Sequence, residues 1–417
     1  MLLFIYSQLI RLALPFILFR LWWRGRKAPA RRKDWSHRLG YVPRLQGTVI
    51  WVHAVSVGET IAAGPMVNRL LQSNPNTTIL MTATTDTGLA QAKKMFGERV
   101  AYAYAPYDTP GAIRRFLRRV NPRILVILET EIWPNMIDQC HRFEVPVFLI
   151  NARLSERSAQ GYERVRGLAA PIMKKITWIA AQAEKDAQRF RRIGVAPESV
   201  EVTGSVKFDV DISEATRAAA LRCRQSLGKR PIWVAGSTHS GEDVQLLEAH
   251  RIVLEQHPEA LLIIVPRHPE RFDSVAQLVA DNGFKLARRS LEQSAEGAQV
   301  YLGDTMGELM MLYGAGDIAF VGGSLVERGG HNPLEPAAWS IPVLTGPHVF
   351  NFETIFERLQ ANGGVQVVQE ATELGRAIAG LVAAPDECRA VGQRALEVVN
   401  SNRGALDKVV EGIVERL

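Results

Sequence analysis

The feature that most restricts the fold of this chain is an alternation of short apolar runs with longer amphipathic stretches, which begins near residue 48. Buried strands separated by helices are typical of a parallel sheet covered on both faces, so an α/β fold is predicted. The strands are expected at residues 49–52, 78–82, 124–128 and 147–150, with helices near 59–73, 86–96, 110–120 and 133–143.

The same alternation restarts in the second half of the chain. Strands are expected there at residues 232–235, 261–265, 318–321 and 342–344. A chain of 417 residues is too long for one ordinary core. We therefore predict two doubly wound domains of Rossmann type, with a boundary near residues 205–230. In such folds ligands bind at the carboxyl ends of the strands, so the site is expected in a cleft that the two domains face.

The N-terminus combines an apolar run with strong positive charge. Residues 1–23 are mostly apolar and end in Trp22-Trp23, and residues 1–40 carry nine basic side chains against Asp34, a net +8 that leaves −1 for the rest of the +7 chain. This pattern predicts a membrane anchor with the protein body on the cytoplasmic side, and it does not indicate nucleic acid binding. A cleaved signal peptide fits less well, because the charges follow the apolar run. Spanning the bilayer and lying in its interface both remain open, since Ser7, Gln8 and Arg11 share one helical face.

Loops with phosphate-binding chemistry follow the strands of the second half. The glycine-rich loop 322–330 leads to Asn332-Pro333, expected as the N-cap and first residue of a helix whose N–H groups attract an anion. The alternative is that Asn332 and Glu335 only form a capping box. Arg267 is either a two-pronged phosphate donor or a solvated side chain. The sequence has neither a Walker lysine motif nor a Gly-x-Gly-x-x-Gly fingerprint, which weakens the ATPase and dehydrogenase hypotheses.

Acidic residues follow two predicted strands of the first half. Glu59 stands at a helix N-terminus whose dipole would keep it ionised as a base, unless it merely completes a capping box with Ser56. Glu129 and Glu131 follow the strand 124–128, and one of them is a candidate helix cap. Asp209-x-Asp211 resembles a metal-binding pair without further ligands, and the three cysteines are far apart. No metal site is therefore predicted.

Four arginines of the helix at 110–120 are expected on one face, opposite apolar side chains. They are Arg114, Arg115, Arg118 and Arg119. This face is either solvated or, beside a membrane anchor, binds anionic lipid head groups.

Several longer motifs together resemble one family. They are SVGET (56–60), ETEIWPN (129–135), NARLSERS (151–158), TGSVKFD (203–209), PRHPERF (266–272), GDTMGEL (303–309) and GGSLVERGGHNPLEPAA (322–338). With these motifs, which extend over nearly the whole chain, the sequence closely resembles the 3-deoxy-D-manno-octulosonic acid (Kdo) transferases of Gram-negative bacteria. The resemblance implies a GT-B glycosyltransferase fold, CMP-Kdo as donor, and a lipid A precursor (lipid IVA) as acceptor at the cytoplasmic face of the inner membrane. Inverting transfer without a metal or other cofactor is expected.

The family's site residues carry over by motif. Glu59 corresponds to the catalytic base, and Glu129 and Lys207 to groups that stabilise the transition state. The implied donor-binding residues are Pro266, Arg267, Met306, Gly307, Glu308, Asn332, Pro333, Leu334 and Glu335. The expected division is an anchor at 1–27, an acceptor-binding domain at 28–210 and a donor-binding domain at 211–417. A nucleotide-sugar epimerase and a non-catalytic membrane scaffold are the alternative functions.

Overall fold

The computed structural model describes residues 1–24 and 34–417, without the side chain of Arg24. The basic run predicted at 24–33 therefore lies almost entirely outside the described residues. The chain forms two compact units. Unit 1 comprises Met1–Lys207 together with Arg403–Leu417, and unit 2 comprises Phe208–Asn402. The sequence assigned all of 211–417 to one domain, whereas the last fifteen residues pack with unit 1.

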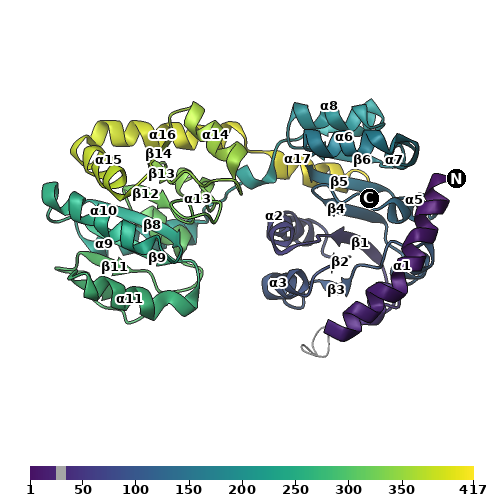
Figure 1. Cartoon of the computed structure of the whole chain (residues 1–417), viewed down its shortest axis with the longest axis horizontal. Helices are drawn as coiled ribbons and strands as arrows, with labels where there is room; N and C mark the ends of the chain where they lie inside the picture. Colours follow the sequence, from purple (N-terminus) through teal and green to yellow (C-terminus); the bar gives the residue numbers. More distant parts are fainter. Residues whose placement is uncertain (25–33) are drawn as a thin grey trace. The chain divides into compact units, whose positions relative to one another are not determined.

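Unit 1 contains a seven-stranded sheet of order β3-β2-β1-β4-β5-β6-β7, in which every pairing is parallel (Figure 1). Its strands are β1 (Thr48–His53), β2 (Thr77–Ala83), β3 (Ala101–Tyr104), β4 (Ile124–Leu128), β5 (Val147–Ala152), β6 (Trp178–Ala181) and β7 (Val200–Val202). The central strands β1, β4 and β5 are almost wholly buried, because helices cover both faces of the sheet.

The helices of unit 1 include the four that the sequence predicts. They are α1 (Leu2–Arg24), α2 (Val57–Ser73), α3 (Asp86–Phe96), α4 (Pro110–Val120), α5 (Pro134–Arg142), α6 (Glu156–Arg164), α7 (Arg166–Met173), α8 (Glu184–Arg192) and α17 (Ala405–Val414), with 3-10 turns η2 (Trp35–Leu39), η3 (Pro197–Ser199) and η4 (Val206–Phe208). By length and composition α1 is able to cross a membrane.

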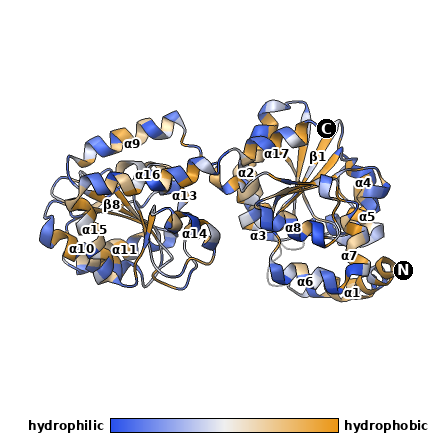
Figure 2. Ribbon diagram, turned by 90° about the horizontal axis from the view of Figure 1, so that it is seen from above, coloured by the Kyte–Doolittle hydropathy of each residue, from blue (hydrophilic) through white to orange (hydrophobic). Residues whose placement is uncertain are grey.

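Unit 2 repeats this architecture with a parallel sheet of order β10-β11-β9-β8-β12-β13-β14. Its strands are β8 (Ile232–Thr238), β9 (Leu261–Pro266), β10 (Leu286–Arg288), β11 (Val300–Leu302), β12 (Ile318–Val321), β13 (Val343–Thr345) and β14 (Val365–Val367). Its helices are α9 (Glu214–Leu227), α10 (Asp243–Gln256), α11 (Phe272–Asp281), α12 (Leu309–Ala315), α13 (Leu334–Ala337), α14 (Glu353–Ala361), α15 (Ala371–Ala383) and α16 (Pro385–Ser401), with η5 (Pro269–Arg271). Figure 2 shows apolar strands in the interior and helices whose polar sides point outward.

Candidate functional site

Glu59 lies in the first turn of α2, directly after β1. Ser56 is the N-cap and accepts a hydrogen bond from the Glu59 N–H at 3.3 Å. The Glu59 carboxylate in turn accepts from the Val55 N–H at 2.7 Å and from Ser56 Oγ at 2.9 Å. The capping geometry is thus present. Burial nevertheless raises the pKa of Glu59 above its ordinary value, against the lowering effect of these hydrogen bonds.

Two more carboxylates lie at the same edge of the sheet. Glu129 follows β4, the neighbour of β1, and adopts a left-handed φ of 58° with its N–H bonded to Ile150 O. Its charge contributes to the raised pKa of Glu59. Burial and the charge of Glu59 raise the pKa of Glu131, whose Oε2 accepts from Trp133 Nε1 at 3.0 Å. Glu59, Glu129 and Glu131 therefore form one acidic cluster.

The predicted capping of α5 by Glu129 or Glu131 is not observed. The N-cap of α5 is Trp133, which makes no side-chain capping bond. The buried carboxylate of Asp108 instead accepts from the first backbone N–H groups of the helix, those of Asn135 at 3.1 Å and Met136 at 2.8 Å. Glu129 and Glu131 therefore do not cap this helix.

Lys207 lies in η4, after the edge strand β7 of the same sheet. The segment that carries it is held by Asn151, at the end of β5, whose Oδ1 accepts from Ser205 Oγ and from the Val206 N–H, both at 3.3 Å. The structure therefore fixes the backbone of Lys207 at the carboxyl edge of the sheet that also carries Glu59 and Glu129.

The four arginines of α4 have two different environments. Arg115 Nε and Arg119 Nη1 donate to the carbonyl oxygens of Leu39 and Val42, and both guanidinium groups lie over the ring of Tyr41. The sequence predicts a single basic face, but the structure divides it. Only Arg114 and Arg118 are exposed, whereas Arg115 and Arg119 hold the segment before β1.

Unit 2 contains a pocket of about 420 Å³ at the carboxyl edge of its sheet. Six residues predicted for donor binding line it: Pro266, Arg267, Met306, Gly307, Asn332 and Glu335. Asn332 Oδ1 accepts from the Leu334 N–H, and its Nδ2 donates to Glu335 Oε1 at 3.3 Å. Burial raises the pKa of Glu335, while Asn332 and Arg267 act in the opposite direction. A polar ligand with both hydroxyl and anionic groups fits this set.

Three other residues predicted for donor binding do not line this pocket. The Glu308 carboxylate forms two 2.9 Å hydrogen bonds with Arg289 and a third with Thr305, so it faces a neighbouring depression. Pro333 and Leu334 are buried, and Leu334 belongs to the core beside β13. The helix also begins one residue later than predicted, with Pro333 at the N-cap position of α13. β8 also continues to Thr238, three residues beyond the strand predicted at 232–235.

The glycine-rich loop already binds a carboxyl group of the protein itself. The carboxylate of Glu242, which is fully buried, accepts from the backbone N–H groups of Gly323 at 2.8 Å, Ser324 at 3.0 Å and Leu325 at 3.1 Å. It also accepts from the His239 N–H at 3.1 Å. The N–H groups of residues 323–325, within the loop 322–330, are therefore occupied and are not available to a ligand phosphate.

The sequence also failed to single out a histidine pair at the pocket. His239 Nε2 and His331 Nε2 are 2.9 Å apart, and the rings are stacked with an interplanar angle of 3°. Burial and neighbouring cationic groups lower the pKa of both to about 4, so both are neutral near pH 7. His331 directly follows Gly329-Gly330, and this position beside the glycine-rich loop was the sequence feature that could have indicated it. Positive charge for a ligand of this pocket must come from Arg267.

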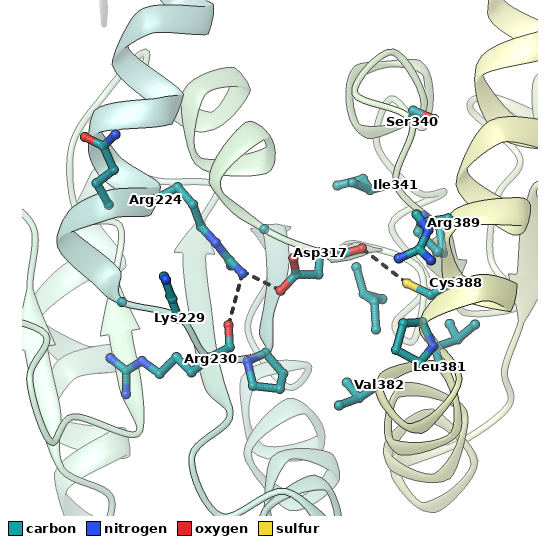
Figure 3. Close-up of a pocket in the computed structure, with 17 residues that line it drawn as sticks. Arg224, Lys229, Arg230, Asp317, Ser340, Ile341, Leu381, Val382, Cys388 and Arg389 are labelled. Atoms are coloured by element: carbon teal, nitrogen blue, oxygen red, sulfur yellow. Dashed lines mark hydrogen bonds and ion pairs between the residues drawn. The ribbon is translucent and has the colours of Figure 1, made fainter.

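A second cavity, of about 720 Å³, lies at the opposite, amino edge of the unit 2 sheet (Figure 3). Two of its arginines bind other groups of the protein. Arg224 binds Asp317 at 3.1 Å and two carbonyl oxygens. Arg230 donates to the carbonyl oxygens of Leu227, Ala295 and Ala298. Ligands of doubly wound sheets bind at the carboxyl edge, so the 420 Å³ pocket is the stronger candidate site. Among the described residues, no three or more His, Cys, Asp or Glu side chains are placed so that they could hold a metal ion together.

Two Rossmann-like units, each with a parallel sheet covered by helices, are the architecture of the GT-B fold class. Solved structures support this fold: the UDP-GlcNAc 2-epimerase of Neisseria meningitidis matches with a TM-score of 0.57 and 15% identity over 88% of this chain and 100% of that one. HepE of Anabaena in complex with UDP matches with a TM-score of 0.55 and 12% identity over 89% and 100%.

The sequence comparisons are more specific than the fold. Residues 33–210 match the family model of 3-deoxy-D-manno-octulosonic acid transferases. The chain is 41% identical to the 3-deoxy-D-manno-octulosonic acid transferase of Haemophilus influenzae, over 98% of this chain and 97% of that protein. It is 34% identical to that of Bordetella pertussis, over 99% of each. The chain belongs to the Kdo transferase family and is a glycosyltransferase.

Proposed function

We propose that the protein transfers Kdo from CMP-Kdo to a lipid A precursor, lipid IVA, in lipopolysaccharide biosynthesis at the cytoplasmic face of the inner membrane. The observation that carries this proposal is the acidic cluster of unit 1, in which Glu59 is fixed by Val55 and Ser56 while burial raises its pKa. A carboxylate with these properties is a stronger base than an exposed one, as proton abstraction from a sugar hydroxyl requires.

The reaction follows from the roles of these groups. Glu59 takes the proton of the acceptor hydroxyl, whose oxygen attacks the anomeric carbon of Kdo. The bond to CMP breaks, the electron pair leaves with the phosphate, and a single displacement inverts the configuration. The 420 Å³ pocket supports donor binding, because Glu335 suits ribose or base groups and Arg267 suits the phosphate. Lys207 is proposed as a second cationic group for the transition state.

The proposal is tested by incubating the purified full-length protein with ready-made CMP-Kdo and detergent-dispersed lipid IVA, followed by mass spectrometry of the lipid. We expect a mass increase of one or more Kdo units, undiminished by EDTA. Glu59→Gln should bind CMP normally but react about 10²–10⁴-fold more slowly. Conversion of CMP-Kdo without any lipid product would instead favour an epimerase-like activity, and restoration of an EDTA-inhibited reaction by Mg²⁺ would refute the metal-free mechanism.

A further inference from the structure

The apolar helix α1 is bound to the rest of unit 1 through polar groups near its amino end. Tyr6 Oη donates to Asp108 Oδ2 at 2.9 Å, and Ser7 Oγ donates to Asn135 Oδ1 at 2.7 Å. Ser7, Asp108 and Asn135 are at most 5% exposed. Leu3 packs against the core beside them. Figure 1 shows α1 running along unit 1 next to α5. The first two turns of α1 are therefore part of the folded body.

The chain beyond α1 also returns to unit 1. Arg38, in η2, is buried, donates to Thr84 O at 3.0 Å, and accepts from the Tyr107 N–H through its own carbonyl. Both flanks of α1 are thus attached to the same unit. A helix of 23 residues is about 34 Å long, close to the thickness of the hydrocarbon core. If α1 crossed that core, Tyr6 and Ser7 would emerge on the side opposite unit 1, and neither hydrogen bond could form.

A stripe of exposed apolar side chains runs along the full length of α1, and the exposed side chains of Phe4, Ile17 and Trp22 lie outside it. Successive members of this stripe are three to four residues apart, as one face of a helix requires. The stripe consists of Ile5, Leu9, Leu12, Phe16, Phe19 and Trp23. All six are exposed, from 46% for Ile5 to 77% for Phe16. Arg11 and Arg20 are exposed on the same helix and are long enough to reach lipid head groups.

We infer that α1 lies in the plane of the membrane, docked on unit 1 by Tyr6 and Ser7, with the stripe Ile5–Trp23 inserted among the acyl chains of one leaflet. This inference rests on the proposed membrane location and resolves how the chain meets the bilayer. The partner is the surface of a bilayer with anionic head groups, because basic side chains accompany the stripe and residues 1–40 carry a net charge of +8. An in-plane helix also avoids placing Arg11 near the bilayer centre, which costs about 2.5–3.5 kcal/mol.

The test measures the depth of three stripe positions in the full-length protein. Single spin labels are attached to Ile5→Cys, Leu12→Cys and Phe19→Cys in a Cys388→Ser background, with Cys140 and Cys223 buried, on vesicles of phosphatidylethanolamine and phosphatidylglycerol. An in-plane helix gives three similar depths. A spanning helix separates the outer two labels by about 21 Å along the bilayer normal, because each residue rises 1.5 Å. Such a gradient would overturn the inference.

Two controls separate this inference from the proposed function. A label at Ile10→Cys, on the docked side, should be shielded from lipid, and Tyr6→Phe with Ser7→Ala should loosen α1 without abolishing vesicle binding. If the protein fails to float with vesicles at all, both the membrane location and the in-plane helix are wrong. Kdo transfer to detergent-dispersed acceptor is measured separately, so a failure of the chemistry is recognised independently of the depth result.

Discussion

Glu59 experiences two opposing influences, and their balance determines what it can do. Hydrogen bonds from Val55 and Ser56 favour its ionised form, while burial and the nearby Glu129 favour the protonated form and dominate. Because the pKa in the folded protein is raised, ionised Glu59 lowers the stability of the fold relative to protonated Glu59. This destabilisation sets in as the pH rises above the ordinary value of 4.5. A helix cap does not need a raised pKa, whereas a raised pKa makes the proposed base stronger.

The pH dependence of transfer should report this balance. We expect the acid limb of kcat/KM to have its midpoint above pH 4.5, with activity falling as the pH drops through the raised pKa of Glu59. In Glu129→Gln the midpoint should move to lower pH, because one of the groups that raise this pKa is neutralised. Glu98→Gln, at an exposed position of unit 1, should leave the midpoint unchanged. An unshifted limb in Glu129→Gln would argue that the titrating base is another group.

Glu242 should be essential to the glycine-rich loop although it touches no substrate. Glutamine offers one acceptor oxygen where the carboxylate serves four N–H groups, so Glu242→Gln leaves buried donors facing an amide NH₂. We expect a loss of about 2–4 kcal/mol in the free energy of unfolding, measured with denaturant. Glu248→Gln, exposed on α10, is the control. Equal unfolding midpoints for both variants would mean that the loop does not depend on this carboxylate.

At the scale of elements, α4 shows how one basic face divides into two roles. Arg114→Ala and Arg118→Ala should weaken binding to anionic vesicles, by about 1 kcal/mol or fivefold each, with little effect on thermal stability. Arg115→Ala and Arg119→Ala should mainly lower the melting temperature, because they release the segment at Leu39–Val42. Flotation and thermal unfolding measured on all four variants distinguish the pairs. A uniform effect on both measurements would contradict this division.

Helices with long periodic patterns were predictable, and short strands were predictable only in part. The helices at 86–96 and 110–120 have the predicted bounds, because eleven residues suffice to show an apolar face. β3 and β7 have four and three residues and were missed, whereas β12 and β13, which are equally short, were predicted from their apolar runs. At the site, chemistry next to a strand end was predictable, whereas the pairing of Glu242 with Gly323 joins groups 81 residues apart. That Glu242 occupies N–H groups of the predicted phosphate-binding loop is therefore seen only in the structure.

At the scale of the whole molecule, the chain crosses between its units twice. After unit 2 is complete, α17 returns to unit 1 and buries Ala405, Leu406, Val409, Val410 and Ile413 against the sheet. The fit is close: a Cβ on Gly412 would come within 2.5 Å of the Trp178 ring. This return was not predictable, because an amphipathic helix near a chain end packs equally well on either doubly wound unit.

This connection predicts an asymmetric response to damage in α17. Val409→Asp places a charge at a position with 0% exposure, at a cost of several kcal/mol, against a typical total stability of 5–15 kcal/mol per domain. Unit 1 should unfold at a lower temperature and transfer should fail, because the proposed catalytic groups Glu59 and Glu129 belong to unit 1. CMP binding should persist, since the pocket that contains Arg267 and Glu335 lies wholly in unit 2. The control is Lys408→Asp, exposed on the same helix. Calorimetry together with CMP titration decides the matter, and simultaneous loss of CMP binding in Val409→Asp would show that the two units fold as one.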